Sequence, residues 1–421
     1  AGAASLYEPA LLRVVEISPE VLDGAAFFAD KNHSVFSYPG LEMRIADGKN
    51  YTEAMTETYD VITADPIHPW VSGSGALYSY EHYASCRRHL AAGGVFCQWL
   101  PLYQLSNEDI RIILQSFVAA FEHCQLWVTE FDGILIGSEN GVTMDHRRFA
   151  AVLVDHRIHA DLEELQLAAP EAVATCYLLG PRELARVCGG APMNTEDRPI
   201  IEFSSPRSMY KLTEVANLRM LFEAGTPPTT RFADQKDMRL TGDWSMNDLA
   251  ANARAADLVT SGNLRFGEGD MEGAQRDYRH ALAALPGYPA ARHRLSRMFL
   301  RLGELAVKRD DTAAAAACYE QARSVFPEDV TPDMLDYLGF LYYRLGQTEA
   351  AGTTWRTALA MAPGSWSSTN NLCNLLAEQG RFPEALAIID SFLALMPDHG
   401  EAAALRTRLH RAGAAQQAQD S

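Results

Sequence analysis

The sequence predicts two folds in one chain: an α/β domain with a doubly wound, mostly parallel sheet, incomplete at its N-terminus, and then an all-α superhelix. Short apolar strands alternate with amphipathic helices up to about residue 140, which is typical of a parallel sheet covered by helices. Beyond about residue 256, alanine, aromatic and proline residues recur at a nearly constant interval, which indicates helical repeats. We therefore predict an α/β domain at 1–140, a helical extension of it at 141–207, a linker at 208–255, a repeat array at 256–410 and a disordered tail at 411–421.

The composition excludes several classes of protein. A formal net charge of −18 over 421 residues argues against a nucleic-acid-binding surface. The chain holds no run of about 18 apolar residues, so we predict no membrane segment within it. Its seven cysteines are scattered and form no CxxC pair, so neither a disulfide framework nor a metal site is expected. This cysteine usage favours a reducing, cytoplasmic compartment.

Two predicted strands lead to acidic residues. Residues 11–17 form the first strand, with Glu16 near its end, and the next helix begins at Ser18 with Pro19 in its first position. Residues 41–45 form the second strand, which leads to Asp47 and Gly48. A carboxylate followed by glycine suits a place where the backbone approaches a ligand closely.

The strand at 59–64 is the centre of the predicted site. It is apolar, and Asp65 follows it at the carboxyl end, where open α/β sheets bind ligands. Asp65 can take a proton or hold a cationic group there, or it can simply cap the turn before Pro66. His68 can act as a base or donor, or it can be a packed structural residue, and we favour the packed role.

The following elements continue the alternation of strand and helix. We expect a helix from Tyr80 to Leu90 closed by Gly93-Gly94, a strand at 95–99 that contains Gln98, a helix capped by Ser106, and an antiparallel pair at 126–128 and 134–136. Trp70 and Trp99 either line a pocket or are core aromatics.

The segments 15–19, 47–51, 59–65 and 93–98 resemble, in this order, motifs of the spermidine synthases, or aminopropyltransferases, which have the class I methyltransferase, Rossmann-like fold. Pro69-Trp70, Gln98-Trp99 and the segment 194–203 are similar to the bacterial branch in which this domain is fused to other segments, often N-terminal membrane helices. The resemblance covers residues 1 to about 207. It implies a cytoplasmic protein, or one at the cytoplasmic face of the inner membrane if such helices precede this chain.

The resemblance also implies roles for particular residues. Glu16, Asp47, Gly48 and Asp65 would bind decarboxylated S-adenosylmethionine or S-adenosylmethionine as a co-substrate, with no permanently bound cofactor, while Asp65 would be the catalytic base. His68 and Gln98 would face the acceptor, a polyamine or another small amine. The function implied is aminopropyl transfer to an amine, coupled to a protein-interaction array. The alternatives are an S-adenosylmethionine-dependent methyltransferase and a non-catalytic repeat scaffold.

Three departures from the family pattern bear on the substrate. The first strand and most of the glycine loop are absent, so the chain resembles the C-terminal part of a longer protein whose sheet lacks a central strand here. His68 stands where spermidine synthases carry a second, amine-binding aspartate, and their tyrosine- and proline-rich loop has no clear counterpart after Gln98. We therefore expect the Asp65 site to stay inactive until an upstream strand and loop are restored, and the repeats to fold and bind a partner alone.

The middle of the chain carries no catalytic grouping. Residues 141–190 are predicted to be helical, and 194–203 to be a polar turn that enters a short strand, with a structural ion pair between Asp197 and Arg198. The breaker-rich segment 224–230 is a candidate linker.

The repeats resemble tetratricopeptide repeats, whose period is about 34 residues. Small alanines let paired helices approach, an aromatic residue fills the gap between repeats, and proline ends each second helix. Four copies are recognisable, the last of them degenerate: Ala274, Tyr278, Ala281 and Pro286; Ala315, Tyr319, Ala322 and Pro327; Ala351, Trp355, Ala358 and Pro363; Ala385, Ile389, Phe392 and Pro397. The resemblance implies a concave surface for a protein or peptide.

Overall fold

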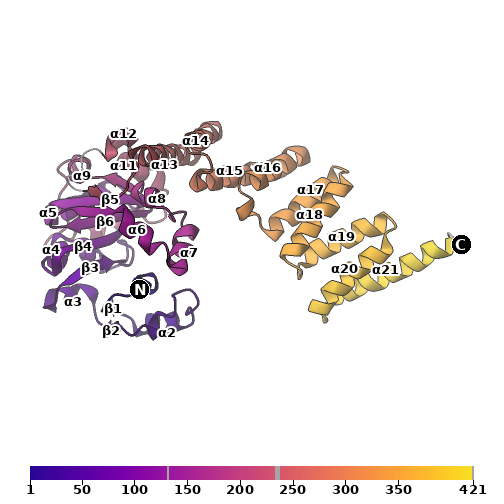
Figure 1. Ribbon diagram of the computed structural model, residues 1–421, viewed down its shortest axis with the longest axis horizontal. Coiled ribbons are helices and arrows are strands. Elements are labelled where there is room, and N and C mark those ends of the chain that lie inside the picture. The colour runs from indigo at the N-terminus through magenta and orange to yellow at the C-terminus, as the bar shows by residue number, and fades with distance from the viewer. Residues whose placement is uncertain (130–131, 233–237, 420–421) are drawn as a thin grey trace. The chain divides into compact units, whose positions relative to one another are not determined.

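The computed structural model describes residues 1–129, 132–232 and 238–419, in two compact units, 1–286 and 287–421 (Figure 1). The first unit is an α/β structure and the second is helical. This confirms the predicted succession of an α/β fold and helical repeats, while the exact limits of the predicted domains remain predictions.

The first part of the α/β unit alternates strands and helices as predicted. Its principal elements are α1 (Gly2–Ser5), β1 (Leu12–Glu16), α2 (Pro19–Ala26), β2 (Leu41–Ile45), α3 (Gly48–Ala54), β3 (Tyr59–Ala64), the short helix η2 (Ser74–Tyr78), α4 (Tyr80–Arg88), β4 (Leu90–Pro101), α5 (Asn107–Ala120), β5 (His123–Thr129) and β6 (Asp132–Ser138). Ser106 caps α5 in a capping box with Asp109, which is the helix start that the sequence indicates.

The strands form separate sheets. β1 and β2 pair in parallel, with Leu12 opposite Leu41 and Glu16 opposite Ile45. The largest sheet has the order β3-β4-β6-β5-β8, and only its β3–β4 pair is parallel. The sheet is therefore more mixed than predicted, because the β5–β6 hairpin and β8 add antiparallel strands. No sheet pairing joins β1 to β3 in the described residues, which agrees with the predicted interruption.

One arginine links the two sheets across this interruption. Arg13, on β1, pairs with Glu42 on β2 at 2.8 Å and donates hydrogen bonds to Glu57, Tyr51 and the Tyr59 hydroxyl on β3. Its side chain is only 12% exposed, so these charge-assisted bonds form in a partly dehydrated place. These bonds hold β1, β2 and β3 together at their N-terminal ends, opposite the carboxyl ends where the site is predicted.

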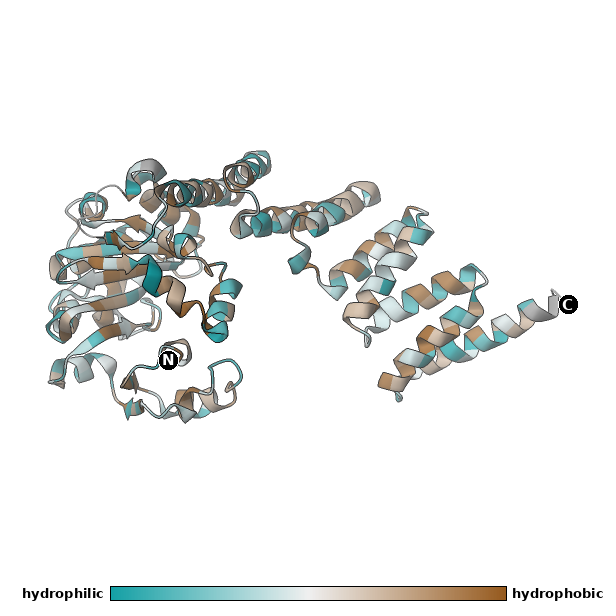
Figure 2. Ribbon diagram, viewed as in Figure 1, coloured by the Kyte–Doolittle hydropathy of each residue, from teal (hydrophilic) through white to brown (hydrophobic). Residues whose placement is uncertain are grey.

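The core of the α/β unit is mostly aliphatic, with a group of packed aromatic rings in it. The rings of Phe96 and Phe121 stack with centroids 5.7 Å apart, and Phe117 packs 5.0 Å from Phe121. A Cβ at Gly137 of β6 would lie only 2.5 Å from the Phe121 ring, so the glycine makes room for it. Figure 2 shows hydrophobic residues in the strands of the largest sheet.

Glycines 93 and 94 do not close α4, contrary to the prediction. They lie inside β4, which begins at Leu90, where the register with β3 shifts. Gly93 has a φ of 80°, and a Cβ at Gly94 would lie 3.0 Å from the carbonyl oxygen of Tyr59. The two glycines therefore form part of a β-bulge against β3 and do not end a helix.

The middle of the chain is more structured than predicted. Its elements are β7 (Val142–Asp145), α6 (His146–Val152), α7 (His156–Glu164), α8 (Pro170–Ala174), β8 (Tyr177–Leu179), α9 (Pro181–Cys188), α10 (Ile200–Ser204), α11 (Glu214–Ala224), α12 (Pro228–Arg231) and β9 (Met238–Thr241). The predicted linker at 208–255 instead holds α11, α12 and β9, and β9 pairs in parallel with β7. The predicted strand after 194 is the helix α10; residues 233–237 of the linker lie outside the described residues.

The repeat region consists of paired helices. They are α13 (Met246–Gly267) with α14 (Met271–Ala284), α15 (Pro289–Lys308) with α16 (Thr312–Val325), α17 (Pro332–Arg344) with α18 (Thr348–Met361), and α19 (Trp366–Glu378) with α20 (Phe382–Leu395), followed by α21 (Gly400–Gln419). Gly269, Gly346 and Gly380 take left-handed conformations at the turns within their pairs, and Asp310 takes the same conformation in the second pair. The expected disordered tail is helical to Gln419, because its alanine and glutamine residues favour a helix that α21 already begins.

Each of the first three pairs contains a matched glycine and aromatic residue. A Cβ at Gly262 would clash with Tyr278, one at Gly303 would lie 2.8 Å from Tyr319, and one at Gly339 would lie 2.5 Å from Trp355. The corresponding positions of the fourth pair are the buried Cys373 and Ile389. The aromatic ring therefore fills a gap within its own pair, in addition to the role between repeats that the sequence predicted.

We predict that Gly339→Ala destabilises the repeats by about 1–3 kcal/mol, because the new methyl group overlaps the Trp355 indole. Urea unfolding of the full chain, followed by circular dichroism, measures this change. Gly352→Ala in α18 is the control: its nearest contacts lie at 3.4 Å, so better helix propensity should stabilise the chain by up to about 1 kcal/mol. Equal effects of the two substitutions would contradict the proposed overlap.

We also predict that stability falls between pH 6.5 and about pH 4 because of His82. Burial lowers the pKa of His82 in α4 from 6.5 to about 4. Between these two pH values the imidazole is protonated in the unfolded chain but neutral in the native protein, which favours unfolding. Above pH 6.5 His82 does not lower the free energy of unfolding, and this free energy falls by roughly 3 kcal/mol as the pH falls to 4. Urea unfolding at several pH values should show a flatter profile for His82→Gln, but an unchanged profile for the control His159→Gln at a half-exposed position.

Candidate active site

Asp65 and Gln98 lie at neighbouring strand ends. Ala64 of β3 is opposite Gln98 of the parallel strand β4, and Asp65 follows Ala64 with an exposed side chain. Gln98 is fully buried; its Nε2 donates to the carbonyl oxygen of Leu77 and to the Tyr83 hydroxyl, whereas its Oε1 has no partner in the described residues. Since β3 and β4 are parallel, their carboxyl ends form one ligand-facing edge.

An aromatic cluster of His68, Trp70, Trp99 and Tyr103 lies at the same edge. The His68 ring is 4.5 Å from that of Trp70 and 5.3 Å from that of Trp99, and its Nε2 is 3.3 Å from the Tyr103 hydroxyl. His68 is therefore packed among rings, the arrangement that the sequence analysis favoured. Rings gathered in this way offer negative faces to a cation.

Three site residues were not predicted from the sequence: Tyr78, Tyr103 and Asp132. Asp132, at the start of β6, accepts a hydrogen bond from Trp99 Nε1 at 2.9 Å. Burial and the charges of Asp132 and Asp65 raise the pKa of Tyr103, and burial and Asp65 raise that of Tyr78. The Tyr78 hydroxyl is buried and has no hydrogen-bond partner in the described part of the chain. Tyr103 follows Gln98 closely, although no tyrosine-bearing loop was recognised there.

Glu16, Asp47 and Gly48 form a second group, on the sheet of β1 and β2. Glu16 ends β1 and accepts a hydrogen bond from the backbone of Ser18 at 2.9 Å; Asp47 caps α3 by accepting one from Asn50 at 2.8 Å. A Cβ at Gly48 would meet nothing within 4 Å, and Gly48 has ordinary helical geometry. The predicted close approach of a ligand at Gly48 stays a prediction. In the described residues, no hydrogen bond or ion pair joins this group to the Asp65 group.

The loop after Asp65 is held by the segment that follows Asn194. Glu202 accepts hydrogen bonds from the backbone of Gly73 at 2.8 Å and of Gly75 at 3.3 Å, and Ser205 donates to the carbonyl oxygen of Pro69 at 2.9 Å. The fully buried Asn194 donates to the carbonyl oxygen of Gly75 at 2.8 Å.

The predicted ion pair in this segment is absent. Neither Asp197 nor Arg198 forms an ion pair within the described ranges, and the two are part of a turn closed by backbone bonds between Thr195 and Arg198. Asn194, Glu202 and Ser205 anchor the loop instead. Asn194 and Glu202 lie in the segment 194–203 that the sequence analysis noted only as a family-like motif, and Ser205 was not singled out.

Other kinds of site are not found in the described residues. No group of three His, Cys, Asp or Glu side chains there could hold a metal ion, and no helix there is long and apolar enough to span a membrane. Burial raises the pKa of Cys97, next to Gln98, to about 11 and that of Cys86 to about 12, so neither thiol is an activated nucleophile.

The geometry defines a Rossmann-like α/β domain with acidic strand ends, joined to helical repeats. Residues 7–132 match the family model of the spermine/spermidine synthase domain, and residues 342–409 match that of the tetratricopeptide repeat. The chain thus carries a spermine/spermidine synthase domain followed by tetratricopeptide repeats, as the sequence motifs indicated.

Similar proteins include two polyamine aminopropyltransferases. That of Nitrosomonas europaea is 34% identical over 107 residues, 24% of this chain and 32% of that protein. Polyamine aminopropyltransferase 2 of Hyperthermus butylicus is 27% identical over 152 residues, 35% of this chain and 50% of that protein. The crystal structure of a probable spermidine synthase from Corynebacterium glutamicum has a TM-score of 0.33 and 18% identity over 46% of this chain and 66% of that one. The chain spans a third to a half of the length of the two aminopropyltransferases.

We predict that Glu202→Ala frees the loop at Gly73 and Gly75. The substitution removes a carboxylate that accepts hydrogen bonds from both amides, so their hydrogen exchange should quicken by about tenfold or more. Amide exchange measured by mass spectrometry or NMR gives this rate. Glu108→Ala is the matched control, because Glu108 is exposed and makes no contact with the loop; unchanged exchange in Glu202→Ala would refute the anchoring role.

Proposed function

We propose that the α/β domain transfers an aminopropyl group from a decarboxylated S-adenosylmethionine-type donor to an amine. The observation that carries this proposal is the meeting of Asp65, Gln98 and the aromatic cluster at the carboxyl ends of β3 and β4. The unpartnered Gln98 Oε1 and Tyr78 hydroxyl at the same edge support it, because buried polar atoms without partners are costly unless a ligand or water meets them.

The reaction needs a neutral amine and a base. The nitrogen lone pair forms a bond to the carbon next to the sulfonium, while the electron pair of the breaking carbon–sulfur bond stays on sulfur, which becomes a neutral thioether. The attacking nitrogen then carries an extra proton, and Asp65 is placed to accept it. Holding the amine in line with that carbon supplies the rest of the acceleration.

The remote end of a diamine is a cation, and the aromatic cluster suits it. The ring faces of Trp70, Trp99 and Tyr103 attract an ammonium group, and Asp132 beside Trp99 adds a negative charge. Asp132 can thereby replace the carboxylate that is lacking at His68. Gln98 Oε1 is a further acceptor for an ammonium hydrogen.

Glu16 and Asp47 are proposed to hold the nucleoside of the donor. Both follow parallel strands, the usual position for carboxylates that bind ribose hydroxyls. Each uses one oxygen to accept a backbone hydrogen bond, which fixes the side chain and leaves the other oxygen for a ligand. The open space at Gly48 admits a ligand at the start of α3.

Methyl transfer from S-adenosylmethionine is the second candidate, favoured by His68 in place of a second carboxylate. The repeats are proposed to bind a protein or peptide in either case. Calorimetry with the two donors separates the enzymatic alternatives, since tighter binding of the decarboxylated form supports aminopropyl transfer. Binding of neither donor would overturn both.

We predict that Asp65→Asn lowers the turnover of putrescine by about 10²- to 10⁴-fold, because the base is lost. Donor affinity, measured by calorimetry, should change much less than turnover. Asp60→Asn is the matched control, since Asp60 is an exposed aspartate of the same strand, β3. Equal turnover in the two variants would exclude Asp65 as the base.

A further inference from the structure

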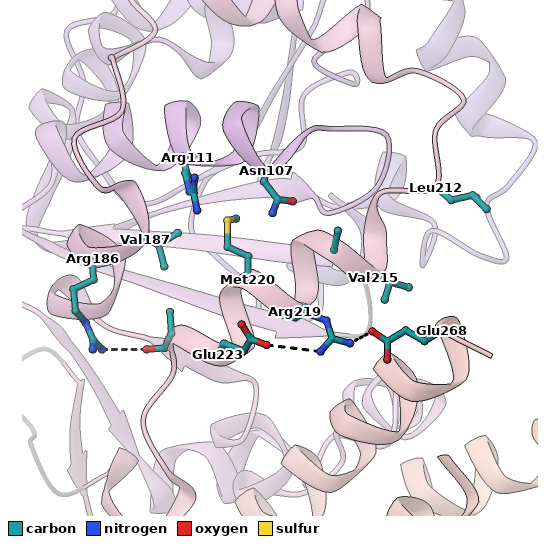
Figure 3. A pocket seen from close by; sticks show the side chains of 12 residues that line it. Asn107, Arg111, Arg186, Val187, Leu212, Val215, Arg219, Met220, Glu223 and Glu268 are labelled. Carbon is teal, nitrogen blue, oxygen red and sulfur yellow. Dashed lines mark hydrogen bonds and ion pairs between the residues drawn. The ribbon is translucent and has the colours of Figure 1, made fainter. Parts of the chain in front are cut away.

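A cavity of about 730 Å³ lies among α5, α9, α11 and the C-terminal end of α13, all within the first unit (Figure 3). It shares no lining residue with the candidate active site. Its volume is within the range of small-molecule sites, about 300–1,000 Å³.

Three arginines from three different helices line the cavity. Arg186 of α9 donates to the carbonyl oxygen of Ala224 at 3.1 Å, and Arg219 of α11 pairs with Glu268 and, at 3.7 Å, with Glu223. Both guanidinium groups therefore have protein partners. Arg111 of α5 is the exception.

Arg111 has no hydrogen-bond or ion-pair partner in the described part of the chain, and its Nε is buried without an acceptor. Figure 3 shows Arg111 and Asn107 projecting from α5 on the same side, toward Met220 of α11. A buried guanidinium nitrogen without an acceptor is costly, and an anion in the cavity would remove that cost.

The charges of the lining favour one negative charge. Arg186 pairs with Glu183 at 3.4 Å and Arg219 pairs with Glu223 and Glu268, so among the arginines of the lining Arg111 alone has no carboxylate partner in the described residues. Glu223 and Glu268 would repel a doubly charged phosphate. The planar guanidinium fork matches a carboxylate, which carries a single charge and can accept two parallel hydrogen bonds.

Half of the residues that line the cavity are apolar. Val187, Val215 and Met220 line it beside the arginines, and Figure 3 shows Met220 between Arg111 and the Arg219 ion pairs, with Val187 near Arg111 and Val215 near Glu268. Such a surface suits a hydrocarbon body a few carbons long, while Asn107 adds an amide donor next to Arg111. We propose that this cavity is a binding site for a small organic monocarboxylate with an apolar body, and that Arg111 holds its carboxylate.

Ligand-observed NMR titration of the full chain tests the proposal, with hexanoate as the probe. Hexanoate should bind saturably with a dissociation constant in the millimolar range, about tenfold tighter than its neutral isostere hexanamide. Inorganic phosphate should bind more weakly than hexanoate. Equal binding of hexanoate and hexanamide, tighter binding of phosphate, or no saturable binding of hexanoate would overturn the proposal.

Variants assign the binding to Arg111. Arg111→Met should lower hexanoate affinity by about tenfold without lowering the melting temperature, because it removes a buried, unpartnered nitrogen but keeps the apolar stem. Arg111→Lys keeps the charge without the fork and should bind with intermediate affinity. Arg147→Gln, which alters an exposed arginine paired with Asp243, is the matched control and should bind as the wild type does.

The opposite effect is expected at the glutamate end of the cavity. Glu268→Gln removes one of the two carboxylates that pair with Arg219, while Glu223 remains, and should raise hexanoate affinity by about threefold or more. Wild-type affinity in both Arg111→Met and Arg111→Lys would place hexanoate elsewhere and refute the assignment. A weaker affinity in Glu268→Gln would show that Glu268 does not oppose the anion and would refute the charge argument.

Discussion

The side chain and backbone of one buried asparagine, Asn194, connect three parts of the α/β unit. Its backbone nitrogen donates to Ser116 of α5 at 2.8 Å, its carbonyl oxygen accepts from Tyr80 at the start of α4, and its side chain bonds to Gly75 and Ile201. Asn194, Ser116 and Ile201 are fully buried, and there the loss of one hydrogen-bond partner leaves the other unsatisfied at a cost of about 1–3 kcal/mol. The hydrogen bond from the Asn194 side chain to the carbonyl oxygen of Gly75 fixes the far end of the loop that begins at Asp65.

The neighbouring contacts depend on the same arrangement. Asn194 accepts a hydrogen bond from the backbone of Ile201 in α10, and Glu202 and Ser205, which follow directly, bond to the loop. The loop in turn carries His68 and Trp70 to Trp99 and Tyr103. A buried polar contact far from the strand ends thus sets the geometry of the aromatic cluster.

The features that follow from local sequence could be predicted. The strand before Asp65, the capped start of α5 and the paired repeat helices each result from a short-range pattern of apolar, capping or breaking residues. The family resemblance implied that Asp65 and Gln98 belong to one site, and the β3–β4 register places Ala64, next to Asp65, opposite Gln98.

The features that depend on distant partners could not be predicted. Asp132 and Trp99 meet only through the β4–β6 pairing, and Glu202 reaches Gly73 across more than a hundred residues, for which no local pattern gives a signal. β9 was missed because its four residues form a strand only against β7. Gly93-Gly94 was misassigned because a glycine pair is equally typical of a helix end and of a bulge.

The matching of Gly339 with Trp355, and of Cys373 with Ile389, keeps the fit of large and small side chains inside one helix pair. A change to either member strains its own pair, whereas a duplicated or deleted pair carries its complement with it. The array can therefore change in length by whole pairs more readily than it can change at one of these positions. Recombination between copies, rather than stepwise substitution at these buried sites, is the mutational route that this packing leaves most open.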